Sequence, residues 1–303
     1  MPRFLPVLAV VALGVALTGC ASDEPEAPST SAPDGQAECA APGKASDSVI
    51  VTGEFGETPT VEFSAPLAAS TLERTVVKKG DGRAVEAGDQ VFVDLALYDG
   101  QSGELVDVSD FDGVGLGLPL VEGYTAQEFI DIITCSTVGS RVVAVVPAAE
   151  GGDSDSTAVV VLDVLPLPTP AAWTENVPEV VFGEDGTPVV TIPQTEAPTQ
   201  LQVAVLTEGD GPVVEDGDDV TVDYMGLRWD TNEVFDESFS REPTTFGTGD
   251  VVRGFGAALV GQKVGTTLLV SIPPALGYGV EETSNGLGGK TLVFLVEIAD
   301  TKN

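Results

Sequence analysis

The sequence of 303 residues contains no histidine, only 13 lysine and arginine residues, and few aromatic residues (6%). Without histidine, the chain has no Ser-His-Asp or Cys-His catalytic group and no imidazole ligand for a metal. The 48 acidic residues give a net charge of −35, and a field of that sign repels phosphate backbones. These absences exclude histidine-dependent catalysis and predict that nucleic acid is not a partner.

The composition predicts a folded chain rich in turns and short strands. It is 43% hydrophobic, with 35 glycines and 21 prolines, and its length suits about two domains. Acidic clusters such as Asp216-Gly217-Asp218-Asp219 lack the spacing of an EF-hand calcium loop. We therefore predict no metal and no cofactor.

The N-terminus has the pattern of a targeting segment. Arg3 precedes an apolar run from Phe4 to Leu17, which is short for a membrane span and typical of a signal peptide. The run ends in Leu17-Thr18-Gly19-Cys20, which resembles the bacterial lipobox. That resemblance implies a signal peptide at residues 1–19 and a diacylglyceryl group on Cys20, which would anchor the protein to the extracytoplasmic face of the cell membrane. An ordinary cleaved signal with an incidental cysteine is the alternative.

Residues 20–47 are rich in Ala, Ser, Pro, Asp and Glu, with almost no large apolar side chain. Such a composition buries too little surface to offset its ordering entropy, so it predicts a flexible tether after the acylated cysteine. If Cys20 is lipidated, Cys39 and Cys135 remain. An even remainder in an exported protein suggests one disulfide, with two free thiols as the alternative.

The sequence repeats itself. The segment VVKKGDGRAVEAGDQVFVDL aligns without gaps to VLTEGDGPVVEDGDDVTVDY, which lies 129 residues further on. Across residues 75–107 and 204–236, 13 of 33 positions are identical. Each unit ends in a β-branched run, at Thr157–Leu165 and at Thr291–Ile298. The repeat predicts one fold used twice, joined around Pro166–Pro170.

The local patterns of the second unit indicate strands and one short helix. Residue types favour strands at Val220–Leu227, Leu268–Ile272 and Thr291–Ile298, and a helix at Phe255–Gln262. An antiparallel sheet covering one short helix is the natural two-layer solution, so the predicted class is α+β. The predicted divisions are a first domain at 48–166, a linker with leading strands at 167–202, and a second domain at 203–303.

The second unit resembles the FKBP-type peptidyl-prolyl cis-trans isomerases. The resemblance rests on GDGPVVEDGDDVTVDYMG, EVFDES, VVRGFGAALVGQKVG, IPPALGYG and TLVFLVEI, in family order from Val203 to Ala299. It implies two tandem FKBP-like domains, each with a five- or six-stranded antiparallel sheet wrapped on a short helix. A proline-binding pocket is expected between the sheet and the helix of the second domain.

The resemblance also implies the residues of that pocket. It assigns catalytic roles to Tyr224, Phe235, Asp236 and Tyr278. We expect Asp236 to be a buried carboxylate paired with Arg241, and the Tyr278 hydroxyl to reach a substrate carbonyl. The residues implied to bind substrate are Arg241, Phe246, Val251, Val252, Phe255 and Phe294. The chain departs from the family where Phe255 replaces a common tryptophan, where Thr244 replaces a common wall phenylalanine, and where the flap at 280–290 has no histidine.

This chemistry agrees with what the sequence lacks. Rotation about an X-Pro bond breaks amide resonance across a barrier of about 18–20 kcal/mol but makes and breaks no covalent bond. A catalyst therefore needs no nucleophile, metal or histidine, only a shape that prefers the twisted amide.

The first unit lacks most of these aromatic residues. The alignment places Leu95 opposite Tyr224, Val106 opposite Phe235, and Tyr124 opposite Phe255. It also places Asp107 opposite Asp236, Gly152 opposite Tyr278, and Val160 opposite Phe294. The helical region, Thr125–Val138, is expected to be about five residues longer than in the second unit. We predict a degenerate FKBP-like domain with little or no isomerase activity.

The function predicted from the sequence is isomerisation of X-Pro bonds in unfolded or exported polypeptides by a lipid-anchored protein. A non-catalytic FKBP-like binding or chaperone lipoprotein is the alternative. The resemblance further implies that macrolides such as rapamycin or tacrolimus fit the pocket.

Overall fold

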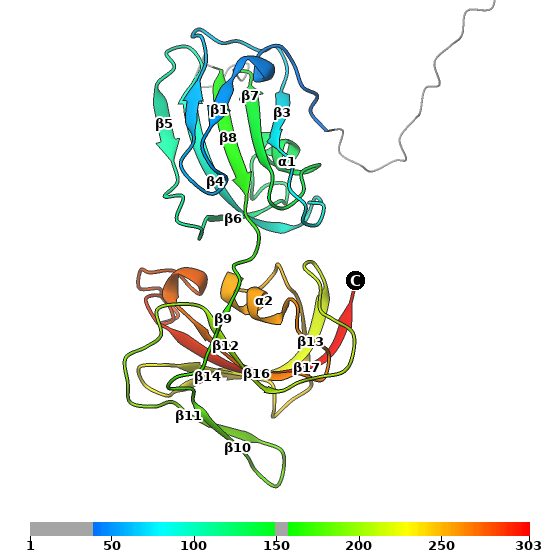
Figure 1. Ribbon diagram of the computed structural model, residues 1–303, viewed down its shortest axis with the longest axis vertical. Coiled ribbons are helices and arrows are strands. Elements are labelled where there is room, and N and C mark those ends of the chain that lie inside the picture. Colours follow the sequence, from blue (N-terminus) through cyan, green and yellow to red (C-terminus); the bar gives the residue numbers. More distant parts are fainter. Residues whose placement is uncertain (1–38, 149–156) are drawn as a thin grey trace, which may run out of the picture. The chain divides into compact units, whose positions relative to one another are not determined.

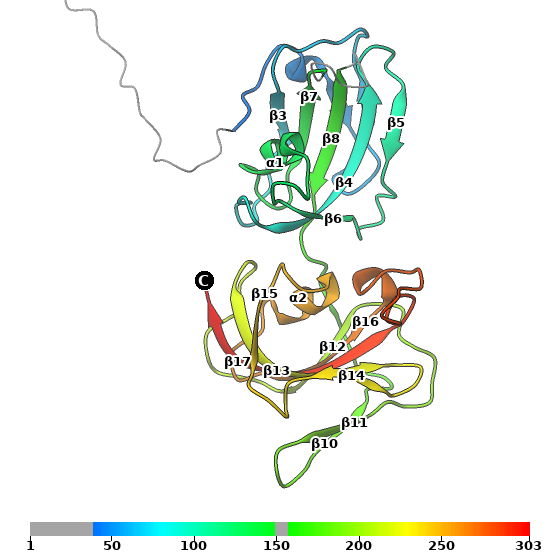
Figure 2. The same cartoon turned by 180° about the vertical axis from the view of Figure 1, so that it is seen from behind.

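The computed structural model describes residues 39–148 and 157–303. The predicted signal peptide at 1–19, the lipidation site Cys20 and the tether as far as residue 38 lie outside the described residues. Within the described part of the chain, no helix is long and apolar enough to cross a membrane. Two domains follow each other, and in each a sheet curves around one short helix (Figures 1 and 2).

The first domain contains a six-stranded antiparallel sheet. Its order is β3-β7-β8-β4-β5, and β6 pairs with the same edge of β4 as β5 does. The helix α1 covers one face through Ile132 and Ile133, which are fully buried against Val142 and Leu162. The elements are β3 (Glu73–Lys78), β4 (Gln90–Asp99), β5 (Leu105–Val108), β6 (Leu116–Pro119), α1 (Gln127–Ile133), β7 (Arg141–Val146) and β8 (Ala158–Val164).

The second domain repeats this arrangement and adds one strand. Its order is β14-β13-β17-β16-β12-β9, and β15 also pairs with β13. The sheet has seven strands: the other six pair antiparallel, as predicted, and β9, which was not predicted, runs parallel to β12. The added strand forms because the incoming chain lies along the free edge of β12. The elements are β9 (Ala171–Ala172), β12 (Gln202–Thr207), β13 (Asp219–Arg228), β14 (Val234–Glu237), β15 (Thr244–Gly247), α2 (Arg253–Leu259), β16 (Thr267–Ile272), η2 (Pro274–Leu276) and β17 (Leu292–Lys302).

The two helices are equally long, which corrects the predicted alignment. Each has seven residues, and the extra residues of the first domain lie in the loops before α1. The Phe129 amide donates to the Ala126 carbonyl at the start of α1, as the Phe255 amide donates to Val252 at the start of α2. Phe129 is therefore the counterpart of Phe255. Tyr124, which the sequence analysis placed there, lies in the preceding loop with 84% of its surface exposed.

The central strands of each sheet are buried on both faces. The helix covers one face, and a leading hairpin with its flanking chain covers the other. The hairpins are β1 (Ile50–Thr52) with β2 (Thr60–Glu62), and β10 (Glu179–Phe182) with β11 (Pro188–Thr191). In the second domain this outer layer includes Trp173, Val190 and Ile192, packed with Leu227 and Leu295 of the sheet. Burial on both faces explains why the strand sequences are continuous apolar runs.

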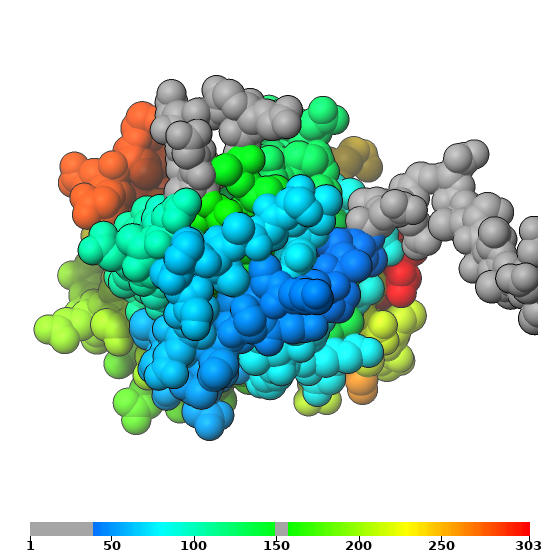
Figure 3. Space-filling model, turned by 90° about the horizontal axis from the view of Figure 1, so that it is seen from above, coloured from blue at the N-terminus to red at the C-terminus, as the bar shows by residue number. Residues whose placement is uncertain are grey.

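The first domain begins before residue 48, so the predicted tether at 20–47 is too long. Ala45 and Ser46 are buried, and η1 (Ser46–Ser48) follows them. The Glu73 carboxylate accepts hydrogen bonds from the amides of Ala45 (2.7 Å) and Ser46 (3.0 Å). These polar partners and the apolar cluster of Ala45 with Val49 order a segment whose composition suggested a flexible chain. Its residues, coloured blue, lie across the face of the domain seen in Figure 3.

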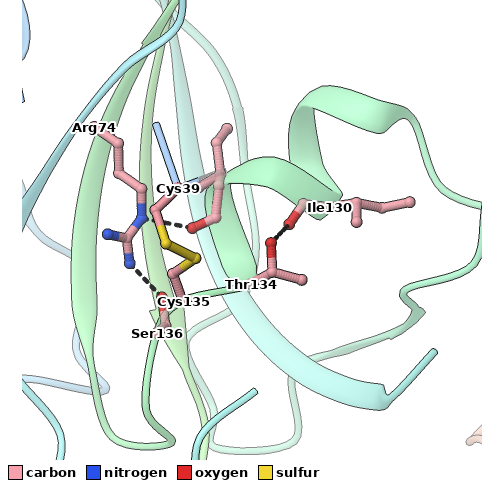
Figure 4. Close-up of a disulfide and its surroundings, with 7 residues drawn as sticks. Cys39, Arg74, Ile130, Thr134, Cys135 and Ser136 are labelled. Atoms are coloured by element: carbon pink, nitrogen blue, oxygen red, sulfur yellow. Dashed lines mark hydrogen bonds between the residues drawn. A yellow bond between two sulfur atoms is a disulfide. The ribbon is translucent and has the colours of Figure 1, made fainter. Parts of the chain in front are cut away.

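A disulfide joins Cys39 to Cys135, which follows the end of α1 (Figure 4). Beside it lies the buried side chain of Arg74, whose Nε donates to the Ile132 carbonyl (2.7 Å) and whose Nη2 donates to the Ser136 hydroxyl (2.6 Å). Burial lowers the pKa of this guanidinium. The bridge fixes the first described residue of the chain to the helix side of the first domain.

We expect the double substitution Cys39→Ser with Cys135→Ser to lower the unfolding free energy of the first domain by about 2–4 kcal/mol, because the bridge closes a loop with a sequence separation of 96. Chemical denaturation followed by circular dichroism measures this loss. Both tryptophans, Trp173 and Trp229, belong to the second domain, so tryptophan fluorescence supplies a control transition that stays unchanged. Equal stability of the variant and the wild type would contradict a structural role for the bridge.

Candidate functional site

A cavity of about 330 Å³ lies between α2 and the sheet of the second domain. This volume suits a prolyl ring with its adjoining peptide bonds, and it lies at the lower end of ordinary small-molecule sites. The lining residues are Tyr224, Phe235, Asp236, Phe246, Asp250, Val251, Val252, Phe255, Tyr278 and Phe294. The structure thus brings together nine of the ten residues that the resemblance places at the site. Arg241 lies behind Asp236 and does not line the cavity.

Five aromatic rings form the walls, and each comes from a different element. Tyr224 lies on β13, Phe294 on β17, Phe235 on β14, Phe246 on β15 and Phe255 on α2. Their rings meet edge to face or tilted, with centroids between 5.0 Å (Phe255 to Phe294) and 6.5 Å (Tyr224 to Phe294). Such pairs contribute about 0.5–1.5 kcal/mol each beyond the burial of their area. The rings therefore support one another and define the shape of the cavity walls.

A chain of polar groups follows one wall. The Tyr224 hydroxyl donates to Oδ2 of Asp236, and Arg241 Nη2 donates to Oδ1 of Asp236 across 2.7 Å. Arg241 also donates from Nε to the Glu237 carbonyl (2.6 Å), which fixes the guanidinium against the β14 turn. The expected pairing with Arg241 is present, but the Asp236 side chain is 49% exposed, so the expectation of a buried carboxylate is wrong. Asp236 sits at the end of an edge strand, where solvent reaches it.

The hydroxyl groups of both site tyrosines are held in the neutral form. Burial, followed by the hydrogen bond to the negative Asp236, raises the pKa of Tyr224 to about 12. Burial and the charge of Asp236 also raise the pKa of Tyr278. The Tyr224 hydroxyl donates its proton to the hydrogen bond with Asp236. Among the described residues, the Tyr278 hydroxyl has no hydrogen-bond partner. The Tyr278 hydroxyl is therefore available as a hydrogen-bond donor at the cavity mouth.

Asp250 lines the cavity, and the sequence analysis did not select it. It directly precedes the Val251-Val252 pair, so its position beside two selected residues was the available signal. Its carboxylate lies over the backbone of Gly247, where an added Cβ would be 2.5 Å from Oδ2. Among the described residues, no lysine or arginine lines this cavity. The mouth of the site is therefore apolar with an acidic edge.

The described residues contain no group of three or more side chains placed to hold a metal ion. The arrangement offers an apolar cavity, a neutral hydroxyl donor and a paired carboxylate. A planar amide is more polar than a twisted one, so an apolar site removes the preference of water for the planar form. Fixed walls that fit the twisted amide then lower the barrier to rotation.

The corresponding positions of the first domain carry no ring of this kind except Phe129. Strand register places Leu95 opposite Tyr224 and Val160 opposite Phe294, and Val106 takes the bulge position of Phe235. Val106 is 61% exposed. Gly152, which the alignment placed opposite Tyr278, lies outside the described residues.

The fold and the site define a member of the FKBP class. A family model described as FKBP-type peptidyl-prolyl cis-trans isomerase matches residues 211–299. A probable FK506-binding protein of Corynebacterium glutamicum is 33% identical over 112 residues, which cover 37% of this chain and 95% of that relative. An FK506-binding protein of Streptomyces anulatus is 37% identical over 116 residues, covering 37% of this chain and 94% of that relative. The chain belongs to the FKBP-type peptidyl-prolyl cis-trans isomerases, which confirms the family predicted from the sequence.

We expect Tyr224 to titrate near pH 12 and Asp236→Asn to lower its pKa while leaving it above 10, because burial remains after the charge is removed. The difference between ultraviolet titrations of the wild type and of Tyr224→Phe isolates this group from the other three tyrosines. The pKa of Tyr224 in the folded protein lies above its value of about 10 in the unfolded chain. Protonated Tyr224 therefore contributes its full share to the free energy of unfolding below pH 10, and this contribution is lost as the pH rises toward 12. A wild-type Tyr224 that titrates at pH 10 would contradict the described hydrogen bond.

Proposed function

We propose that the second domain carries the isomerase activity of this protein. The observation that carries the proposal is the cavity of five aromatic walls, whose side chains come from four strands and the helix of this domain alone. The first domain has Leu95, Val106 and Val160 at three of the five wall positions. A pocket that selects the twisted amide requires those walls, so the first domain keeps the framework without the site.

Within the pocket we assign separate tasks to the walls and to the polar groups. The rings of Phe235, Phe255 and Phe294 exclude water from the prolyl ring and its preceding amide. Tyr278 donates to a substrate carbonyl at the mouth, as the raised pKa of its hydroxyl allows. Asp236, held by Tyr224 and Arg241, fixes the strand end that carries Phe235 and orients the peptide.

The proposed substrates are unfolded or newly exported polypeptides with X-Pro bonds. Three features support this: the signal-peptide pattern, the lipobox ending in Cys20, and a disulfide between Cys39 and Cys135, which suits an oxidising compartment. The proposed location is the extracytoplasmic face of the cell membrane, with the protein anchored by lipid at Cys20. Macrolides such as rapamycin and tacrolimus are proposed ligands of the same pocket.

Substitutions in the two copies of the hairpin test the assignment to the second domain. In the full-length protein, Phe235→Ala is expected to lower kcat/KM for an X-Pro peptide about tenfold or more, equivalent to ~1.4 kcal/mol of transition-state stabilisation. Asp236→Ala and Tyr278→Phe are expected to lower it severalfold. A protease-coupled or NMR exchange assay measures the rate.

The first domain supplies matched controls, since Val106→Ala and Asp107→Ala alter the equivalent positions and are expected to leave the activity unchanged. If the three second-domain variants kept full activity, the assigned pocket would be wrong. If no condition gave catalysis but proline-containing peptides still bound, the non-catalytic binding role would replace this proposal.

Lipidation is tested separately in a bacterial host that processes lipoproteins. We expect the wild-type protein to incorporate labelled palmitate and to sediment with membranes, and Cys20→Ala to do neither, because the acyl chains supply the anchor. Cys39→Ala is the matched cysteine control and should behave as the wild type in this assay. Labelling of Cys20→Ala would show that another group carries the lipid.

A further inference from the structure

The rings of Phe235 and Phe294 lie directly over the backbone of Gly226, near the C-terminal end of β13. A Cβ added to Gly226 would be 2.6 Å from Cζ of Phe235, 2.8 Å from Cε1 of Phe294 and 3.0 Å from Cε2 of Phe235. Carbon atoms in contact are normally about 3.5–4.0 Å apart, so a methyl group does not fit under these rings. The two rings meet edge to face at 5.6 Å and 90°, above a surface that only glycine provides.

The strand register explains why this one residue controls both rings. Gly226 is paired with Phe294 on β17 and with Asp236 on β14, whose neighbour Phe235 occupies the β-bulge. Tyr224 and Gly226 point to the same face of β13, because side chains alternate along a strand. Gly226 therefore lies at the base of the wall that Phe235 and Phe294 form.

The first domain carries a leucine at the same register position. Leu97 is paired with Val160 on β8 and with Asp107 on β5, as Gly226 is paired with Phe294 and Asp236. Leu97 packs against the core of that domain, and the neighbouring wall positions hold the smaller Val106 and Val160. A large side chain at this strand position and large rings on the neighbouring strands thus exclude each other. The second domain has glycine beside two phenylalanines, and the first has leucine beside two valines.

We propose that Gly226 is a positioning residue for the isomerase reaction: its missing side chain lets Phe235 and Phe294 take the places that form the pocket wall. The atoms that an added methyl would meet are the far ends of two phenylalanine rings. These rings swing aside more easily than a backbone moves. A larger residue at 226 therefore displaces the walls while the sheet stays folded, and it acts on catalysis through the rings.

This inference rests on the proposed role of the second domain, and a double-mutant cycle in the full-length protein tests it. We expect Gly226→Ala to lower kcat/KM for an X-Pro peptide about tenfold, mainly through kcat, when measured well below its melting temperature. In a Phe235→Ala background, the same substitution is expected to lower the activity less than threefold further. Residues that act through one another show such non-additive effects.

Gly211→Ala is the matched control for crowding elsewhere in the domain. An added Cβ there would be 2.8 Å from Cβ of Val264 and 3.0 Å from its carbonyl oxygen, away from the cavity. We expect it to lower the melting temperature at least as much as Gly226→Ala and to keep wild-type kcat at low temperature. Leu97→Ala, the counterpart in the first domain, should also leave the activity unchanged.

Should Gly226→Ala alone fail to fold, Gly226→Ala with Phe235→Leu replaces it, because leucine removes Cζ and Cε2 of Phe235, two of the three ring atoms that the added methyl would meet. That pair is expected to fold and to match Phe235→Leu in activity. Full activity of Gly226→Ala, or losses that multiply across the cycle, would overturn the positioning role while leaving the proposed function intact. Full activity of Phe235→Ala, Asp236→Ala and Tyr278→Phe would instead overturn the proposed function.

Discussion

The pairing of β13 with β17, buried on both faces, is the constraint on which the second domain depends. On one face Tyr224 and Phe294 wall the cavity, and on the other Leu227 and Leu295 pack beneath the leading hairpin. A slip of one residue in this pairing would turn the slipped strand over and move its own ring, Tyr224 or Phe294, out of the cavity. The outer layer, which takes no part in the site, thereby helps to fix the register that places the pocket rings. The shape of the pocket is a consequence of packing on both sides of one strand pair.

The two domains show which polar groups serve the fold and which serve the pocket. In each domain a serine hydroxyl donates to an aspartate on the long strand: the half-buried Ser109 donates to Asp94, and the buried Ser238 donates to Asp223. The carboxylates of Asp107 and Asp236 both accept from the next amide along the chain at 2.9 Å. The aspartate at this position is thus present in both copies, and in both it accepts a hydrogen bond from the backbone of its own strand. Its pairing with a tyrosine and an arginine occurs in the second copy, where a pocket exists.

The sequence predicts the strands and the pocket walls well because both have a local signature. The strands predicted at Val220–Leu227 and Leu268–Ile272 fall within β13 and β16. The observed strands are at most one residue longer at each end. Tyr124 was the wrong counterpart of Phe255 because pairing the two implies a longer offset of 131, whereas the offset between the copies falls from 129 to 126 across the loops before the helix. The order of Ala45 and Ser46 was missed because it depends on Glu73, a partner distant in the sequence. Local composition cannot report a contact with a remote residue.

The helix that supplies the pocket floor, α2, has a sequence of low helix propensity. Its close packing against the sheet explains why it contains residues that destabilise a helix. Glycine lowers helix stability by about 0.8–1.0 kcal/mol relative to alanine, and α2 contains Gly254 and Gly256. A Cβ at Gly254 would lie 2.6 Å from Cγ2 of Ile272, so the glycine lets the helix approach the sheet closely. The counterpart of Gly256 in α1 is Ile130, which fills the core as a side chain. The second domain therefore gives up helix propensity to press α2 against the sheet and hold Phe255 beneath the cavity. The first domain has Leu95, Val106 and Val160 in place of three of the five wall rings, and its helix buries Ile130, Ile132 and Ile133 in the core instead.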